Sequence, residues 1–191
     1  MTGAELYLVR HGEAAGADRS DPGLSERGTA QARALGARLA DRRFAGVVHS
    51  PRRRAAQTAA ILSESLPGVP VRPSSRLDDR TPIPSITRRA EYPERYWAWL
   101  DDTALDERDE DGAFLSEAIS EITAAAMREA DTGPLLAVTH AFVIGWFVRA
   151  ALDAPTWRWL GLTSGNTGLT IIRYAADEPR VLTYNDTGHL A

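Results

Sequence analysis

Two short apolar runs that each end in a histidine restrict the fold of this chain more than any other feature. The first, "LYLV" at 6–9, leads into Arg10 and His11, and the second, "LLAVT" at 135–139, leads into His140. Such runs are typical of strands buried on both faces of a parallel sheet. Because sites in open α/β sheets lie beyond the carboxyl ends of the strands, we expect the two histidines to meet at one edge.

The stretches between these runs alternate between helical and extended patterns. Further strands are predicted over 44–50, 69–71, 169–174 and 181–186, and helices over 25–41, 50–66, 115–126 and 141–152. In the second helix, Ser50 is expected to cap the first turn and Pro51 to occupy it. Residues 72–112 are expected to be irregular, apart from a short helix over 95–100, with an acidic, solvated stretch at 101–112. The order of elements predicts an α/β fold, a three-layer sandwich with a mainly parallel central sheet flanked by helices.

Length and composition predict one soluble domain. The chain has 191 residues, so we expect a single domain over 1–191 with an excursion at about 80–131 near the mouth of the site. A net charge of -4 disfavours nucleic acid as a partner. The sequence shows no secretory leader and no run long enough to span a membrane. It also has no cysteine, so thiolate chemistry is excluded, and we expect a cytoplasmic protein.

Arg10 and His11 side by side suit the transfer of a phosphoryl group. A neutral imidazole can attack phosphorus, and a guanidinium fork matches two phosphoryl oxygens at once. Gly12 is expected to let the backbone approach that group because it has no Cβ. All 22 basic residues are arginine, so an arginine alone is weak evidence, and its context must carry the argument.

Five ordered motifs resemble the histidine phosphatase superfamily, which includes the phosphoglycerate mutases. They are "LVRHGE" (8–13), "LSERGTAQA" (24–32), "SPRRRAAQTA" (50–59), "LLAVTH" (135–140) and "YNDTGHL" (184–190). The resemblance covers both ends and most of the middle, and it fails over about 80–131. It implies a phosphoglycerate mutase-like fold and the branch of small phosphatases.

The resemblance implies roles for five residues. His11 would be the nucleophile that becomes phosphohistidine, and Arg10, Arg54, His140 and Gly12 would hold the phosphoryl group, with His140 also counted as catalytic. Arg52 and Arg53 are interpreted as charge on the helix surface, since only one of three successive positions can face the strand ends.

The proton donor to the leaving oxygen is predicted to be Asp79. The family often has a glutamate in this position, and here "SSRLDDR" (74–80) offers an aspartate. Asp78 is its rival, and Glu13 is a third candidate whose place beside Gly12 suggests a partner for an arginine. The alternative is that both aspartates form exposed salt bridges with neighbouring arginines.

Other polar and aromatic residues are given lesser roles. His49 is expected to bond locally, His189 to support the structure, and Asn166 and Asn185 to line the rim or bond locally.

No metal and no cofactor are expected, because arginines supply the positive charge and the histidines lack metal-ligand spacing. The aromatic residues of 92–99 are expected to pack on the core rather than stack on a leaving group. Arg88, Arg89 and Arg95 could meet a second anionic group or be solvated, and "TWRWL" (156–160) could be buried or join two copies in a homodimer.

The predicted function is a metal-independent phosphatase that hydrolyses a phosphate monoester through phospho-His11. Its partners would be a small phosphorylated substrate and inorganic phosphate as product, with no nucleic acid and no membrane. The alternatives are a phosphohistidine protein phosphatase, which needs no acid for its easily lost leaving group, a mutase-type phosphotransferase and a non-catalytic phosphate-binding module. A mutase needs a closed chamber in which an intermediate can reorient away from water, and this short chain leaves little room for one, which favours hydrolysis.

Overall fold

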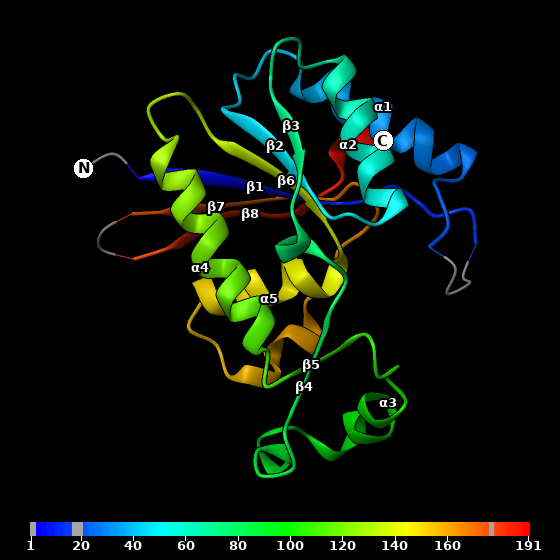
Figure 1. Cartoon of the computed structure of the whole chain (residues 1–191), viewed down its shortest axis with the longest axis vertical. Helices are drawn as coiled ribbons and strands as arrows, with labels where there is room; N and C mark the ends of the chain where they lie inside the picture. Colours follow the sequence, from blue (N-terminus) through cyan, green and yellow to red (C-terminus); the bar gives the residue numbers. More distant parts are fainter. Residues whose placement is uncertain (1–2, 17–20, 176–177) are drawn as a thin grey trace.

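A mainly parallel sheet forms the centre of the protein (Figure 1). The computed structural model describes residues 3–16, 21–175 and 178–191. Within these residues, six strands form this sheet in the order β3-β2-β6-β1-β7-β8. Their bounds are β1 (Ala4–Arg10), β2 (Gly46–His49), β3 (Val71–Pro73), β6 (Leu135–Thr139), β7 (Leu169–Tyr174) and β8 (Arg180–Asp186). Strands β1, β2, β3 and β6 run parallel, whereas β7 is antiparallel to both β1 and β8.

Helices cover both faces of the sheet, because alternate side chains of the central strands point to opposite sides. Leu6 and Leu8 of β1 pack in the core under α4 (Ala113–Arg128) and α5 (Ala141–Ala151). Tyr7 and Val9 pack in the core under α1 (Glu26–Leu39) and α2 (Arg53–Glu64). Figure 1 shows the two helix pairs on opposite sides of the strands. The predicted α/β class, with a mainly parallel sheet between helices, is confirmed.

The excursion after β3 has more regular structure than the sequence predicted. Strands β4 (Thr81–Ile83) and β5 (Arg108–Glu110) form a separate two-stranded parallel sheet, and α3 (Trp97–Asp101) lies between them in the chain. This part extends from the bottom of the view in Figure 1. Pro82 is tolerated in β4 because each of these strands is an edge strand with one partner.

The expectation that 101–112 is a solvated stretch is wrong at Asp109. This carboxylate is only 5% exposed, and it accepts hydrogen bonds from the backbone N–H groups of Phe114 (2.9 Å) and Leu115 (3.0 Å). It therefore satisfies the first turn of α4, where Gly112 in the N-cap position offers no side chain. Burial raises the pKa of Asp109 despite these bonds.

Among the described residues, no helix combines the length and the apolar character that crossing a membrane would require.

Candidate active site

The site forms where four parallel strands end. In the register of the sheet, Arg10 at the end of β1 lies opposite Thr139 at the end of β6, so His11 and His140 leave neighbouring strands at the same level. Ser50 follows β2, and Asp79 follows β3 after a single 3₁₀ turn. The rings of the two histidines lie 5.1 Å apart between centroids. The structure thus brings together two imidazoles that the sequence separates widely.

His11 has one ring nitrogen fixed and the other facing the site. Nδ1 lies 2.7 Å from the carbonyl oxygen of Gly12, which can only accept, so Nδ1 carries the proton. Nε2 is then the unprotonated nitrogen, and it accepts a hydrogen bond from Nε of Arg54 at 3.2 Å. Burial, with smaller contributions from His140 and the two arginines, lowers the pKa of His11 to about 3. The ring is therefore neutral at physiological pH, which is the form a nucleophile needs.

His140 is held between a hydroxyl and a carboxylate. Its Nε2 lies 2.8 Å from Oγ of Ser50, and its Nδ1 lies 3.2 Å from Oδ2 of Asp79. Nδ1 also lies 3.4 Å from NH2 of Arg54, which can only donate, but that NH2 makes its shorter bond, of 2.7 Å, to Asp79. Because the carboxylate is the nearer partner of Nδ1 and can only accept, we assign the proton to Nδ1 and a hydrogen bond from the Ser50 hydroxyl to Nε2. Burial, followed by the nearby arginines, lowers the pKa of His140 well below its usual value. We therefore read the contact with Asp79 as a hydrogen bond from a neutral ring rather than as an ion pair.

The contact between Ser50 and His140 was not foreseen, and the predicted capping role of Ser50 is wrong. Helix α2 begins at Arg53, and Arg52 in the N-cap position makes no side-chain capping bond. Ser50 is completely buried, and its hydroxyl oxygen also accepts from the backbone N–H of Arg52 at 3.3 Å. A serine before a proline resembles a helix cap so closely that no local signal pointed elsewhere.

Two guanidinium groups supply the positive charge. Arg54, on the first turn of α2, donates from NH2 to Oδ2 of Asp79 at 2.7 Å, besides its contact with His11. Arg10 donates from NH1 to the carbonyl oxygen of Ser164 at 2.6 Å, whereas its buried Nε–H has no acceptor. A buried donor without an acceptor costs about 1–3 kcal/mol, which an anionic ligand would recover. Burial lowers the pKa of Arg10, and Asp79 opposes this effect.

The structure separates the two candidate aspartates. Asp79 lies against Arg54 and His140, on the side of the imidazoles. Asp78 accepts from Nε of Arg52 at 2.8 Å and from the backbone N–H of Asp79 at 2.9 Å, so it fixes the loop that carries its neighbour. The interpretation of Arg52 as surface charge is corrected accordingly, whereas the side chain of Arg53 takes part in no recorded bond.

Gly12 and Glu13 connect the site to the first two helices. A Cβ on Gly12 would lie 2.5 Å from the carbonyl oxygen of Gly28 in α1, so the close packing of that helix requires the glycine. The backbone N–H of Gly12 donates to Thr58 of α2 at 3.0 Å. Glu13 accepts from the Ser25 hydroxyl at 2.9 Å and does not face the imidazoles. The expected partnership of Glu13 with an arginine is limited to a long contact of 3.6 Å with exposed Arg27.

The remaining polar candidates make local or structural bonds. His49 Nδ1 lies 2.8 Å from the carbonyl oxygen of Ser50, and His189 Nε2 lies 2.9 Å from Oγ1 of Thr167. Asn166 donates to the carbonyl oxygen of His11 at 3.0 Å, and Asn185 accepts from the backbone N–H of Gly165 at 2.7 Å.

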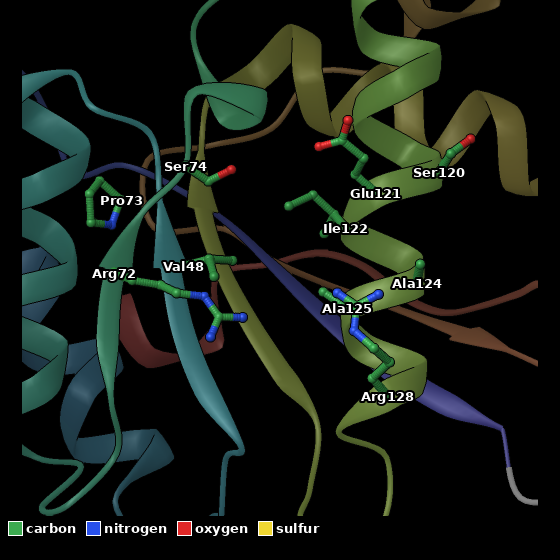
Figure 2. A pocket seen from close by; sticks show the side chains of 10 residues that line it. All are labelled: Val48, Arg72, Pro73, Ser74, Ser120, Glu121, Ile122, Ala124, Ala125 and Arg128. Carbon is green, nitrogen blue, oxygen red and sulfur yellow. The ribbon is translucent and has the colours of Figure 1, made fainter.

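A hollow of about 290 Å³ opens beside the imidazoles. Its lining includes Arg10, His11, Asp79 and His140, followed by residues of α5 and of the segment after it. A separate hollow of about 440 Å³ lies between β3 and α4, where Arg72 and Arg128 extend toward its interior (Figure 2). It contains no histidine, and we assign it no chemistry. Among the described residues, no group of three or more His, Cys, Asp or Glu side chains is placed to hold a metal.

Known proteins with similar sequences are phosphatases by name. "Serine/threonine-protein phosphatase Pgam5, mitochondrial" of Caenorhabditis briggsae is 31% identical over 191 residues, which cover 97% of this chain and 64% of that protein. The protein of that name in Homo sapiens is 29% identical, with 97% of this chain and 63% of the relative covered. The chain thus spans less than two thirds of the length of these relatives.

Solved structures with a similar fold point in the same direction. "Mycobacterial hydrolase 2" superposes with a TM-score of 0.75 at 25% identity, covering 97% of this chain and 91% of that one. A mycobacterial glucosyl-3-phosphoglycerate phosphatase, solved as a complex with VO3, gives a TM-score of 0.71 at 25% identity, with 95% and 99% covered. A phosphoserine phosphatase of Entamoeba histolytica, at 20% identity and a TM-score of 0.73, supports the fold alone.

The expectation of a cytoplasmic protein is corrected by these relatives, which are named mitochondrial. The lack of cysteine on which it rested limits thiol chemistry but does not identify a compartment.

The family follows from a match that spans almost all of the chain. The model of the histidine phosphatase superfamily, branch 1, matches residues 6–187, which include both histidines and both arginines of the site. The chain belongs to the histidine phosphatase superfamily.

Proposed function

We propose that the protein is a phosphatase that hydrolyses phosphate monoesters through a phosphohistidine on His11, without a metal. The observation that carries the proposal is the state of His11: a neutral ring whose protonated Nδ1 bonds a carbonyl oxygen and whose unprotonated Nε2 accepts from the guanidinium group of Arg54. The relatives and structural neighbours named as phosphatases support the same class of reaction.

In the first step, Nε2 of His11 attacks phosphorus and the bond from phosphorus to the leaving oxygen breaks. Arg10 and Arg54 neutralise the charge on the phosphoryl oxygens, and His140 donates its Nδ1–H to one of them. The substrate takes over the contact that Arg54 makes with Nε2. Asp79, a carboxylate in the free enzyme, takes a proton from the bound monoanionic ester and then gives that proton to the leaving oxygen.

In the second step, water attacks the phosphohistidine. Asp79, now a carboxylate, takes a proton from that water while the bond between nitrogen and phosphorus breaks. Inorganic phosphate leaves, and His11 returns to its neutral form. A small phosphorylated substrate and phosphate are thus the partners of this proposal.

The position of Asp79 favours an ester over a phosphohistidine substrate. An alkoxide is a poor leaving group and needs a proton, whereas the imidazole of a phosphohistidine leaves easily. Asp79 lies 2.7 Å from Arg54 and 3.2 Å from His140, within reach of a group bound between them.

Two substitutions test the proposal. His11→Ala should abolish hydrolysis of p-nitrophenyl phosphate, and unchanged turnover in the folded variant would remove His11 from the mechanism. Asp79→Asn should lower kcat for an alkyl phosphate by roughly 100- to 10,000-fold but spare a phosphohistidine peptide. If both substrates lost activity equally, Asp79 would not be the acid, and a wild-type enzyme that accepts only phosphohistidine would make the alternative substrate class correct.

A further inference from the structure

The hollow beside the imidazoles has two chemically different ends. Its polar end is the phosphate site, with Arg10, His11, Asp79 and His140. The rest of its lining is mainly apolar, with two hydroxyl residues: Ala141, Phe142, Trp159, Leu160, Leu162, Thr163 and Ser164. A bound monoester would direct its leaving group from the polar end toward this apolar end.

The rings of Phe142 and Trp159 line the apolar end, and the ring of Trp99 packs against both without itself lining the hollow. These three rings are here called the aromatic wall (Trp99, Phe142 and Trp159). The centroids of Phe142 and Trp159 lie 5.1 Å apart, and Trp99 lies 5.6 Å from Phe142 and 6.1 Å from Trp159. These are ordinary distances for interacting rings. Trp159 is buried, whereas Trp99 keeps 45% of its surface exposed. The expectation that the aromatic residues of 92–99 belong to the core thus holds for Tyr92, at 2% exposure, and not for Trp99.

The described residues place no second cation beside this wall. The three candidate arginines have other neighbours: Arg88 bonds Glu91, Arg89 bonds Asp101, and Arg95 lies over the ring of Tyr96. None of the three lines the hollow, and in the part of the chain described the one arginine that does so is Arg10. A second anionic group on a substrate would lose its water against apolar side chains without gaining a cationic partner.

We propose that the protein prefers phosphate monoesters whose leaving alcohol carries an aromatic or bulky apolar group next to the ester oxygen, over monoesters with a second anionic group. This inference rests on the proposed phosphatase function. It assigns the excursion a part in specificity, because α3 contributes Trp99.

The preference can be measured with esters of similar intrinsic reactivity. The substrates 2-phenylethyl phosphate, glycerol 1-phosphate and 3-phosphoglycerate all release a primary alcohol, so differences in kcat/KM report mainly on recognition. We expect 2-phenylethyl phosphate to exceed the other two by at least about tenfold, the order of magnitude expected for partly burying one ring. An equal or higher kcat/KM for 3-phosphoglycerate would overturn the inference.

Variants of the aromatic wall locate the source of the preference. In Trp99→Ala and Phe142→Leu, the ratio of kcat/KM for the phenylethyl ester to that for the glycerol ester should fall by roughly three- to tenfold. Trp99→Phe should restore most of this ratio. Leu105→Ala is the control, because it removes an apolar side chain that is 82% exposed on the same excursion and has no ring to pack against Phe142 and Trp159. A ratio that survives the loss of Trp99 and of the Phe142 ring, or that falls equally in Leu105→Ala, would refute the assignment.

A binding measurement separates this inference from the proposed function. Phenylphosphonate and methylphosphonate cannot be hydrolysed, and calorimetry gives their Kd values on the wild-type protein. Tighter binding of phenylphosphonate by about tenfold supports the wall even if no ester is hydrolysed, in which case the phosphatase proposal alone fails. Equal Kd values would overturn the inference even if esters are hydrolysed.

Discussion

Replacing Ser50 with alanine should disturb one ring nitrogen of His140 and little else. The Ser50 hydroxyl lies 2.8 Å from Nε2, and the exposed fractions of Ser50 and His140 are 0% and 1%. Because water cannot easily replace the hydroxyl, Nε2 loses its hydrogen bond. A buried polar group left without a hydrogen bond lowers the free energy of unfolding by about 1–3 kcal/mol. For a chain of this size, Tm should fall by roughly 2–12 °C.

The same loss should change which nitrogen of His140 carries the proton. In the wild type, a donor at Nε2 and the Asp79 carboxylate at Nδ1 both favour the Nδ1–H form. Without Ser50, that preference weakens by about 1.4 kcal/mol, the net value of a typical hydrogen bond, which corresponds to a tenfold change in the ratio of tautomers. Since only the Nδ1–H form can donate to the phosphoryl group, we expect kcat/KM to fall by up to about tenfold.

Two measurements distinguish a positioning role from a merely structural one. The ¹⁵N shifts of the imidazoles report the tautomer directly, and the chain has only four histidines to assign. Thr139→Val is the matched control, because it removes another completely buried hydroxyl, which donates to the carbonyl oxygen of Leu77 at 2.8 Å. The control should lose stability but keep the His140 tautomer and most of its kcat/KM. Wild-type ¹⁵N shifts and kcat/KM in Ser50→Ala would refute the reasoning.

Three further predictions concern the same end of the sheet. Because His11 and His140 have lowered pKa values, the unfolded chain binds protons below about pH 6.5 that the folded chain does not bind. The free energy of unfolding, measured by urea titration, should therefore fall by up to about 1.4 kcal/mol per histidine for each pH unit below 6.5. A free energy of unfolding that stays constant down to pH 5 would contradict the burial argument. Gly12→Ala should lower the free energy of unfolding by about 1–3 kcal/mol in the same assay, because the new Cβ would clash with Gly28. A variant as stable as the wild type would show that α1 can move to accommodate the Cβ. Asp78→Asn should reduce kcat for an alkyl phosphate by about tenfold or less, because it loosens the Asp79 loop without removing the acid; a loss as large as that of Asp79→Asn would reverse the two roles.

The sequence predicted those features that depend on neighbours along the chain. The runs at 6–9 and 135–139 appear as β1 and β6, and parallel pairing places the histidines that follow them side by side, because parallel strands end at one edge. The family predicted from the short motifs is confirmed by a match over residues 6–187. Catalytic roles for the individual side chains stay predictions until the variants are assayed.

The features that the sequence did not predict depend on contacts between distant parts of the chain. Ser50 looks like a helix cap until β2 and β6 are paired, which places it against His140. The approach of Gly28 gives a reason for glycine at position 12 that the sequence did not show, and its predicted role at the phosphoryl group stays a prediction. In the sequence, Asp109 is one carboxylate of an acidic stretch expected to be solvated, yet in the structure it accepts hydrogen bonds from the backbone N–H groups at the start of α4. In each case the local pattern was compatible with several roles, and tertiary packing selected one.

Burial has opposite consequences for the two kinds of side chain that meet at this site. It lowers the pKa of His11 to about 3, which keeps a nitrogen lone pair available at physiological pH. The same burial lowers the pKa of Arg10, but a guanidinium begins so high that it stays charged. A lysine in that place would start about two units lower and would lose its proton more readily on burial. A site that needs a neutral nucleophile beside permanent positive charge, in one desolvated space, therefore requires arginine for physical reasons, even in a chain whose composition already favours it everywhere.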